Sequence, residues 1–171
     1  MANFEKFKIS DVRVSFPSVF KKAEYNGQET KYECSFLLHK EKHAAEIAQI
    51  KEAIDECAKD AKIKTPPAHL VCLRDGDEMD YDGTDGHMVL KCSSNRRPTV
   101  VDRDRTPLTE EDGVLYAGCY VNAIVGVWAQ NNKYGKRVNG NLFGIQFAKD
   151  GDSFGAGATD VSDEFDDLED L

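Results

Sequence analysis

The chain contains a single stretch with helical periodicity, residues 41–64, between two groups of strand-like segments. Apolar residues recur there every three or four positions with charged residues between them, which predicts an amphipathic helix. Those apolar positions are Ala44, Ile47, Ile50, Ile54, Cys57 and Ala61. The prolines at 66 and 67 end the helix, since the residue before a proline disfavours helical backbone. Such a narrow, alanine-rich stripe is suited to packing on a sheet or across the end of a barrel.

The other patterned segments have the two-residue alternation of β-strands. Residues 8–16 place Val12, Val14 and Phe16 on one face, and residues 32–39 place Tyr32, Cys34, Phe36 and Leu38 on one face. Strands are also predicted over 70–74, 87–93, 98–102, 116–130 and 138–149, with a hairpin turn at 131–137. A mainly β chain with one inserted helix favours an OB-type small antiparallel barrel, with an open sandwich as the alternative.

The C-terminal segment DVSDEFDDLEDL, residues 160–171, contains seven carboxylates and no basic residue. They are Asp160, Asp163, Glu164, Asp166, Asp167, Glu169 and Asp170. Without them the 31 acidic residues become 24 against 22 basic ones, so the net charge changes from −9 to −2. Dense like charge predicts a disordered tail, joined through a Gly-rich linker. We therefore expect an OB-type domain over 1–150 and a flexible linker with an acidic tail over 151–171.

Several classes of protein lack support in the sequence. No apolar run approaches the ~20 residues of a membrane span, and the N-terminus lacks a signal peptide, so a cytoplasmic protein without membrane contact is expected. Five widely spaced cysteines without a C-x-x-C pair indicate free, mostly buried thiols. The acidic stretch 75–86 matches a calcium loop loosely, but Val89 stands where the closing glutamate would be. We expect no metal and no other cofactor.

Basic residues are grouped in three places outside the helix, two of which also contain aromatic residues. Two arginines precede the strand at 98–102, the hairpin follows the only tryptophan, and two lysines lie between aromatic residues in the loop after the first strand. The members are Arg96 and Arg97; Trp128, Lys133, Tyr134, Lys136 and Arg137; and Phe20, Lys21, Lys22 and Tyr25. Single-stranded nucleic acid is held by cationic grooves and aromatic stacking faces. Alternatively, Trp128 belongs to the core and the charges are ordinary solvated loop residues.

Four blocks carry a resemblance to a known family: residues 13–20 (RVSFPSVF), 90–108 (LKCSSNRRPTVVDRDRTPL), 116–132 (YAGCYVNAIVGVWAQNN) and 149–155 (KDGDSFG). The chain resembles bacteriophage OB-fold single-stranded DNA (ssDNA)-binding proteins, a family formerly catalogued as a domain of unknown function and related to the replicative proteins of podoviruses. The resemblance implies an OB-fold body that coats ssDNA in replication and recombination. It also implies an acidic tail that occupies the DNA groove and contacts polymerase or helicase. Related proteins often end on an aromatic residue, whereas here Phe165 lies inside the tail and Leu171 is last.

Together these features predict a non-enzymatic, sequence-nonspecific ssDNA-binding protein of the host bacterial cytoplasm. Bases are expected to stack on Trp128 and Tyr134, with Phe16 and Phe20 as further candidates. The residues expected to neutralise phosphates are Arg96, Arg97, Lys133, Lys136 and Arg137, with Lys21, Lys22 and Lys91 as weaker candidates. The tail, including Phe165 and Leu171, would compete for the groove and contact a phage or host polymerase, helicase or recombinase; a homodimer is a further option. The alternatives are a scaffold module with a recruiting tail, a strand-annealing recombination protein and, with least support, a nuclease.

Overall fold

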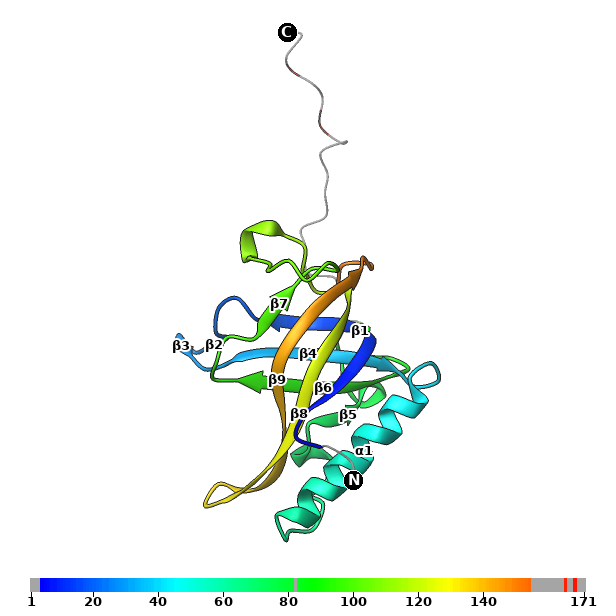
Figure 1. Ribbon diagram of the computed structural model, residues 1–171, viewed down its shortest axis with the longest axis vertical. Helices are drawn as coiled ribbons and strands as arrows, with labels where there is room; N and C mark the ends of the chain where they lie inside the picture. Colours follow the sequence, from blue (N-terminus) through cyan, green and yellow to red (C-terminus); the bar gives the residue numbers. More distant parts are fainter. Residues whose placement is uncertain (1–3, 82, 155–164, 166–167, 169–171) are drawn as a thin grey trace.

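Five strands form a closed barrel in the computed structural model, which describes residues 4–81, 83–154, 165 and 168 (Figure 1). In chain order they are β1 (Phe7–Ser18), β4 (Tyr32–His39), β6 (His87–Ser94), β8 (Tyr120–Asn132) and β9 (Gly135–Lys149). The sheet order β6-β4-β1-β8-β9 is antiparallel throughout and closes by a pairing between β6 and β9. The expected OB-type barrel is confirmed.

The closing pair β6–β9 is parallel, so the barrel is mixed rather than purely antiparallel. Cys92 pairs with Gly140, and Ser93 pairs with Asn141. The two backbones approach closely here because Gly140 has no side chain: a Cβ on it would lie 2.4 Å from the carbonyl oxygen of Lys91.

Short elements extend the barrel at its edges. β5 (Leu73–Asp75) pairs antiparallel with β6, and β7 (Thr99–Val101) pairs parallel with β9. A small hairpin of β2 (Glu24–Tyr25) and β3 (Gln28–Glu29) lies in the loop after β1. Single 3₁₀ turns are η1 (Ala68–Leu70), η2 (Gly76–Glu78) and η3 (Glu110–Asp112).

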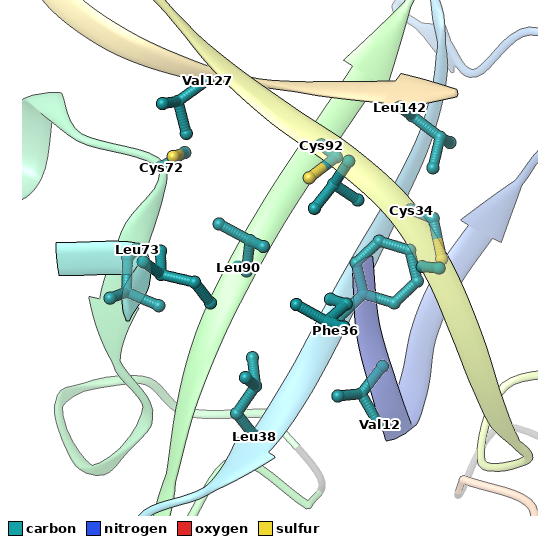
Figure 2. Packing of buried hydrophobic residues seen from close by; sticks show 14 of the residues in the cluster. Val12, Cys34, Phe36, Leu38, Cys72, Leu73, Leu90, Cys92, Val127 and Leu142 are labelled. Atoms are coloured by element: carbon teal, nitrogen blue, oxygen red, sulfur yellow. The ribbon is translucent and has the colours of Figure 1, made fainter. Parts of the chain in front are cut away.

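The barrel interior is filled by alternate side chains of its strands (Figure 2). Val12, Phe36, Leu90 and Leu142, from four different strands, are each at most 2% exposed. The expectation of free, buried cysteines is confirmed for all five. Burial in this apolar interior raises the pKa of the Cys72 thiol to about 12, because it disfavours the thiolate.

The predicted helix is α1 (Ala44–Asp60), which packs against β8 and β9. It is shorter than the expected 41–64, and its first predicted core residue, Ala44, is exposed. The buried face consists of Ile47, Ile50, Ala53, Ile54, Cys57 and Ala58. The small alanines allow the helix to lie close to the strands, as its narrow stripe suggested.

Strand β1 contains two irregularities that alternation does not predict. The register shifts between Ile9 and Val12 and again between Ser15 and Ser18. Asp11 and Phe16 adopt positive φ angles of 55° and 50° at these points. The second bulge turns Phe16 outward, so it is 58% exposed instead of sharing the buried face of Val12 and Val14.

Residues 150–154, which we call the strap, lie against the barrel after β9. Arg13 donates a hydrogen bond from Nη2 to the carbonyl oxygen of Asp152 (2.5 Å), and its guanidinium lies 4.0 Å from the Phe154 ring centroid. The Phe154 amide donates to the carbonyl oxygen of Ala117 (3.1 Å). The strap therefore attaches the C-terminal segment to β1 and to the loop before β8.

Most of the predicted acidic tail lies outside the described residues: Asp160, Asp163, Glu164, Asp166, Asp167, Glu169, Asp170 and Leu171. Of its apolar residues, Phe165 and Leu168 are described and exposed. Within the described part of the chain, no helix is long and apolar enough to cross a membrane.

Candidate nucleic-acid interface

A groove of about 420 Å³ runs over the outer faces of β4 and β6, the second and third strands of the barrel. Its floor is formed by side chains that alternate with the core residues of these strands. Glu33 and Ser35 come from β4; Lys91 and Ser93 come from β6. Lys91 pairs with Ser35, and Ser93 with Glu33, so the four side chains form one continuous outward surface.

Three segments that are distant in the sequence form the walls of this groove. The loop after β1 contributes Tyr25, Thr30 and Lys31, and the β8–β9 hairpin contributes Arg137 and Asn139. The third wall is the segment from η1 to η2, with Leu70, Val71, Arg74 and Met79. In OB folds, the face of the second and third strands, with the loops between strands one and two and between four and five, binds oligonucleotides. The groove occupies that position.

The groove lining carries four cationic side chains, those of Lys31, Arg74, Lys91 and Arg137, and one anionic side chain, that of Glu33. The Glu33 side chain is only 12% exposed, and its Oε2 lies 3.7 Å from Lys91 Nζ. Its other oxygen, Oε1, accepts a hydrogen bond from the Tyr25 hydroxyl. This bond is the largest cause of the raised pKa of Tyr25, with smaller contributions from burial and nearby Tyr81.

Trp128 lies beside the groove on the outer face of β8. It is paired with Asn139 of β9, a groove residue, and directly opposed residues of an antiparallel pair point to the same side. The next outward pair on this face is Gln130 with Arg137. Trp128 is 42% exposed, whereas its neighbour Val127 points into the core. An aromatic face is thus available next to the cationic groove.

The structure brings together some of the residues that the sequence singled out. Lys91 and Arg137 line the groove, and Trp128 lies on the adjoining face. Tyr134 is 75% exposed at the tip of the confirmed β8–β9 hairpin, with Lys133 Nζ 5.1 Å from its ring centroid. Lys136 is also on this hairpin but does not line the groove.

Other predicted site residues lie away from the groove lining. Arg96 and Arg97 are exposed between β6 and β7. Lys21 forms an exposed ion pair with Glu110 (3.6 Å), and Lys22 is half-buried. Phe20 packs against the core, while Phe16 makes an edge-to-face contact with Tyr81, with ring centroids 5.2 Å apart.

Several groove residues were not expected from the sequence, notably Lys31, Glu33 and Arg74, and Tyr25 was noted only as an aromatic neighbour of Lys21 and Lys22. The polar position of Tyr25, next to an Asn-Gly turn, was a usable signal because a tyrosine there has no core to enter. Glu33 alternates with the core residues of β4 and so had to face outward. Nothing in the segments around Lys91 and Arg137 indicated that these two residues would lie on the same surface.

A lysine holds the first acidic residues of the stretch 75–86. Lys40 Nζ lies 2.7 Å from Asp75 and 2.6 Å from Asp77, and this ion pairing lowers the pKa of both carboxyls. Asp77 also accepts a hydrogen bond from the Gly86 amide (2.8 Å). In the part of the chain that the structure describes, no three His, Cys, Asp or Glu side chains are placed to hold a metal ion.

Comparison with known proteins agrees with this geometry. The profile of a family described as Enterobacter phage Enc34, ssDNA-binding protein, matches residues 5–171. The chain belongs to this Enc34 ssDNA-binding protein family. The expectation of a non-enzymatic protein is confirmed, because the family is one of ssDNA-binding proteins.

Relatives of this Enc34-family protein include solved structures. The ssDNA-binding protein of bacteriophage Enc34 in complex with ssDNA is 32% identical, with a TM-score of 0.82 over 90% of this chain and 91% of that one. A second structure of the same phage protein gives a TM-score of 0.81 over 96% of this chain and 92% of that one. Gp2.5, the ssDNA-binding protein of bacteriophage T7, shares the fold at 16% identity, with a TM-score of 0.54 over 96% of both chains.

A sequence relative of the Enc34-family protein comes from another phage. "Putative protein p50" of Acyrthosiphon pisum secondary endosymbiont phage 1 is 40% identical over 173 residues, covering 95% of this chain and 94% of the relative. The match extends over nearly the whole of both chains.

Proposed function

We propose that this protein coats ssDNA without sequence preference during phage DNA replication and recombination. The observation that carries the proposal is the groove with four cationic side chains on the second and third barrel strands, next to the exposed face of Trp128. OB folds bind oligonucleotides on this face. The 32% identical Enc34 protein, which has the same fold, is described in complex with ssDNA.

In the proposed binding mode, bases stack on Tyr25, Trp128 and Tyr134, while Lys91 and Arg137 neutralise phosphates. The rim residues Lys31 and Arg74 extend the cationic track. Stacking uses the π-face that all bases share, and phosphate contacts carry no sequence information, so neither contact selects a sequence.

Residues outside the groove have supporting roles in this proposal. Lys133 and Lys136 on the hairpin, Arg96 and Arg97 after β6, and Lys21 and Lys22 after β1 attract the DNA backbone over a longer range. The exposed pair Phe16 and Tyr81 offers a further stacking surface, whereas Phe20 contributes through the core.

An ssDNA titration followed by the fluorescence of Trp128 tests the proposal. For a single strand, the slope of log affinity against log salt is about −0.7 per neutralised phosphate. We expect K91Q and R137Q each to make the slope shallower by about 0.7, and K8Q and K51Q, which change exposed lysines outside the groove, to leave it unchanged. Absence of binding at low salt would refute the proposal.

We further propose that the acidic tail competes with DNA for the groove and contacts a polymerase, helicase or recombinase. The support is the position of the strap. Phe154 lies next to Gly83 and Leu37, and Leu37 follows Ser35 on the same outer face of β4. The segment that follows Phe154 therefore starts from the face that carries the groove. An extended chain spans about 3.3–3.6 Å per residue, so residues 155–171 are long enough to reach along it.

Burial of Trp128 would favour the scaffold alternative, because a core tryptophan cannot stack on bases, but Trp128 is 42% exposed. Strand annealing would use the same groove. It predicts that the protein accelerates the pairing of complementary strands, which a fluorescence-quenching assay with two labelled oligonucleotides measures.

A further inference from the structure

A second hollow, of about 700 Å³, lies between the β8–β9 hairpin and the segment that follows α1. Three of its lining residues are cationic, Lys62, Lys64 and Lys136, and none is acidic. None of the three lysines forms an ion pair with a described residue. The remaining lining is largely apolar and includes Ile63, Pro66, Pro67 and Leu70. Cationic and apolar groups are thus combined, as in the groove.

The second hollow adjoins the groove. Leu70 lines both of them, and the consecutive residues Lys136 and Arg137 of β9 line one each. Neighbouring side chains of a strand point to opposite faces, so the two cations lie on either side of the same strand. One edge of β9 pairs with β8. On its other edge, counting from Gly135, the first described backbone partner is Val71, which pairs with Val138. The β9 edge at Gly135–Arg137 is therefore open, and a flexible strand can cross it from one hollow to the other.

Lys62 occupies an unusual backbone position for a lysine. Its φ is +59°, in the left-handed region, directly after the end of α1. The Ile63 amide donates to the Ala58 carbonyl oxygen and the Lys62 amide to the Lys59 carbonyl oxygen, both at 3.0 Å. This is the Schellman arrangement, in which glycine is favoured at the position of Lys62. A lysine therefore occupies a position that favours glycine, and its side chain lines the second hollow. The backbone strain indicates that the positive charge of Lys62 has a function there.

We propose that the second hollow extends the ssDNA path beyond the groove, and this inference rests on the proposed function. Lys62, Lys64 and Lys136 hold phosphates, and bases pack on Pro66, Pro67 and Leu70. Continuity with the groove favours a nucleic acid over an acidic peptide, because a strand leaving Arg137 meets Lys136 next. Long strands then contact both hollows, whereas short ones are held by the groove alone.

The test compares K62Q/K64Q/K136Q with the matched variant K8Q/K51Q/K59Q, which removes three exposed lysines that line neither hollow. Binding of thymidine oligonucleotides of about six and about sixteen nucleotides is measured over a range of salt, since OB-fold sites span roughly 4–16 nucleotides. For the long oligonucleotide, we expect the slope of log affinity against log salt to become shallower by about 2 in the first variant only. For the short one, neither variant changes the slope.

Equal effects on both oligonucleotides, or no effect on the long one, would overturn the extension. Retained binding of long DNA together with lost binding of a synthetic peptide of residues 160–171 would assign the hollow to an acidic peptide instead. If the unmodified protein binds neither oligonucleotide, the proposed function itself fails. K62G adds a second measurement: it should raise the melting temperature, because glycine relieves the strain, and still weaken binding of the long oligonucleotide only.

Discussion

Glu33 is the residue that most directly shapes the groove. Its carboxylate lies among four cationic side chains, accepts a hydrogen bond from Tyr25 and lies 3.7 Å from Lys91. The negative charge of this largely covered carboxylate repels phosphate and offsets part of the attraction of Lys91, so the strongest phosphate contacts should lie nearer Arg74 and Arg137. The bases would then point toward the wall of the groove that contains Tyr25.

Substitution E33Q is expected to strengthen ssDNA binding about two- to fivefold at low salt, which corresponds to roughly 0.5–1 kcal/mol. Glutamine keeps the shape of the side chain and removes the charge that repels phosphates and engages Lys91. The gain should shrink as salt rises, because salt screens the charge. Fluorescence anisotropy of a labelled oligonucleotide measures it, with E24Q, an exposed residue on β2, as the control. Weaker binding by E33Q would mean that Glu33 is needed to position Tyr25 and Lys91.

Substitution W128A should lower ssDNA affinity by about 1–3 kcal/mol, roughly 5- to 150-fold, because one stacked base loses its aromatic face. Anisotropy of a labelled oligonucleotide is the suitable measurement, since the variant has no tryptophan. F143A is the matched control: Phe143 is an exposed aromatic residue that faces Lys6 rather than the groove. Equal losses in the two variants would contradict a specific role for Trp128.

At the scale of elements, the helix, the β8–β9 hairpin and most barrel strands could be predicted from the sequence because each has its own periodicity. The bulges of β1 could not. Phe16 looks like a core residue by alternation, and only the shift between Ser15 and Ser18 turns it outward. One extra residue reverses which side chains face the core, and no local pattern encodes where the partner strand will tolerate it.

The strap depends on glycine at position 118. Gly118 has a φ of +112°, and a Cβ on it would lie 2.1 Å from the carbonyl oxygen of Asp152. G118A should therefore lower the free energy of unfolding by several kcal/mol, or displace the strap from Arg13. G27A is the matched control, because Gly27 also has positive φ (+79°) but open space around it, and it should cost only about 1 kcal/mol. Denaturant unfolding measures both; equal losses would show that the contact with Asp152 contributes nothing.

Charge is unevenly distributed over the whole molecule. The net charge is −9, yet residues 1–159 account for only −2, and the groove itself is cationic. Local potential in a groove governs association more than net charge does. The C-terminal segment 160–171 thus places a concentrated negative charge on a chain whose groove is lined mainly by cationic side chains.

Deletion of residues 160–171 is expected to tighten ssDNA binding at low salt and to have little effect at high salt, because the tail would compete for the groove electrostatically. A full-length variant with the seven tail carboxylates changed to the corresponding amides separates charge from chain length. It should behave like the deletion. Salt-dependent titrations of the three proteins measure the effect, and equal affinity of all three would exclude competition by the tail.

Most secondary-structure elements of this protein and the negative charge of its tail follow from the sequence alone, because periodicity and charge density are properties of neighbouring residues. The groove does not follow from it. Tyr25, Glu33, Arg74, Lys91 and Arg137 come from five separate segments, and they meet only because β6 closes on β9 at Gly140. Closure and register determine which outward side chains become neighbours, and these are set by the packing of the whole barrel. A lysine or an aromatic residue becomes part of a binding surface only when that packing places its partners beside it.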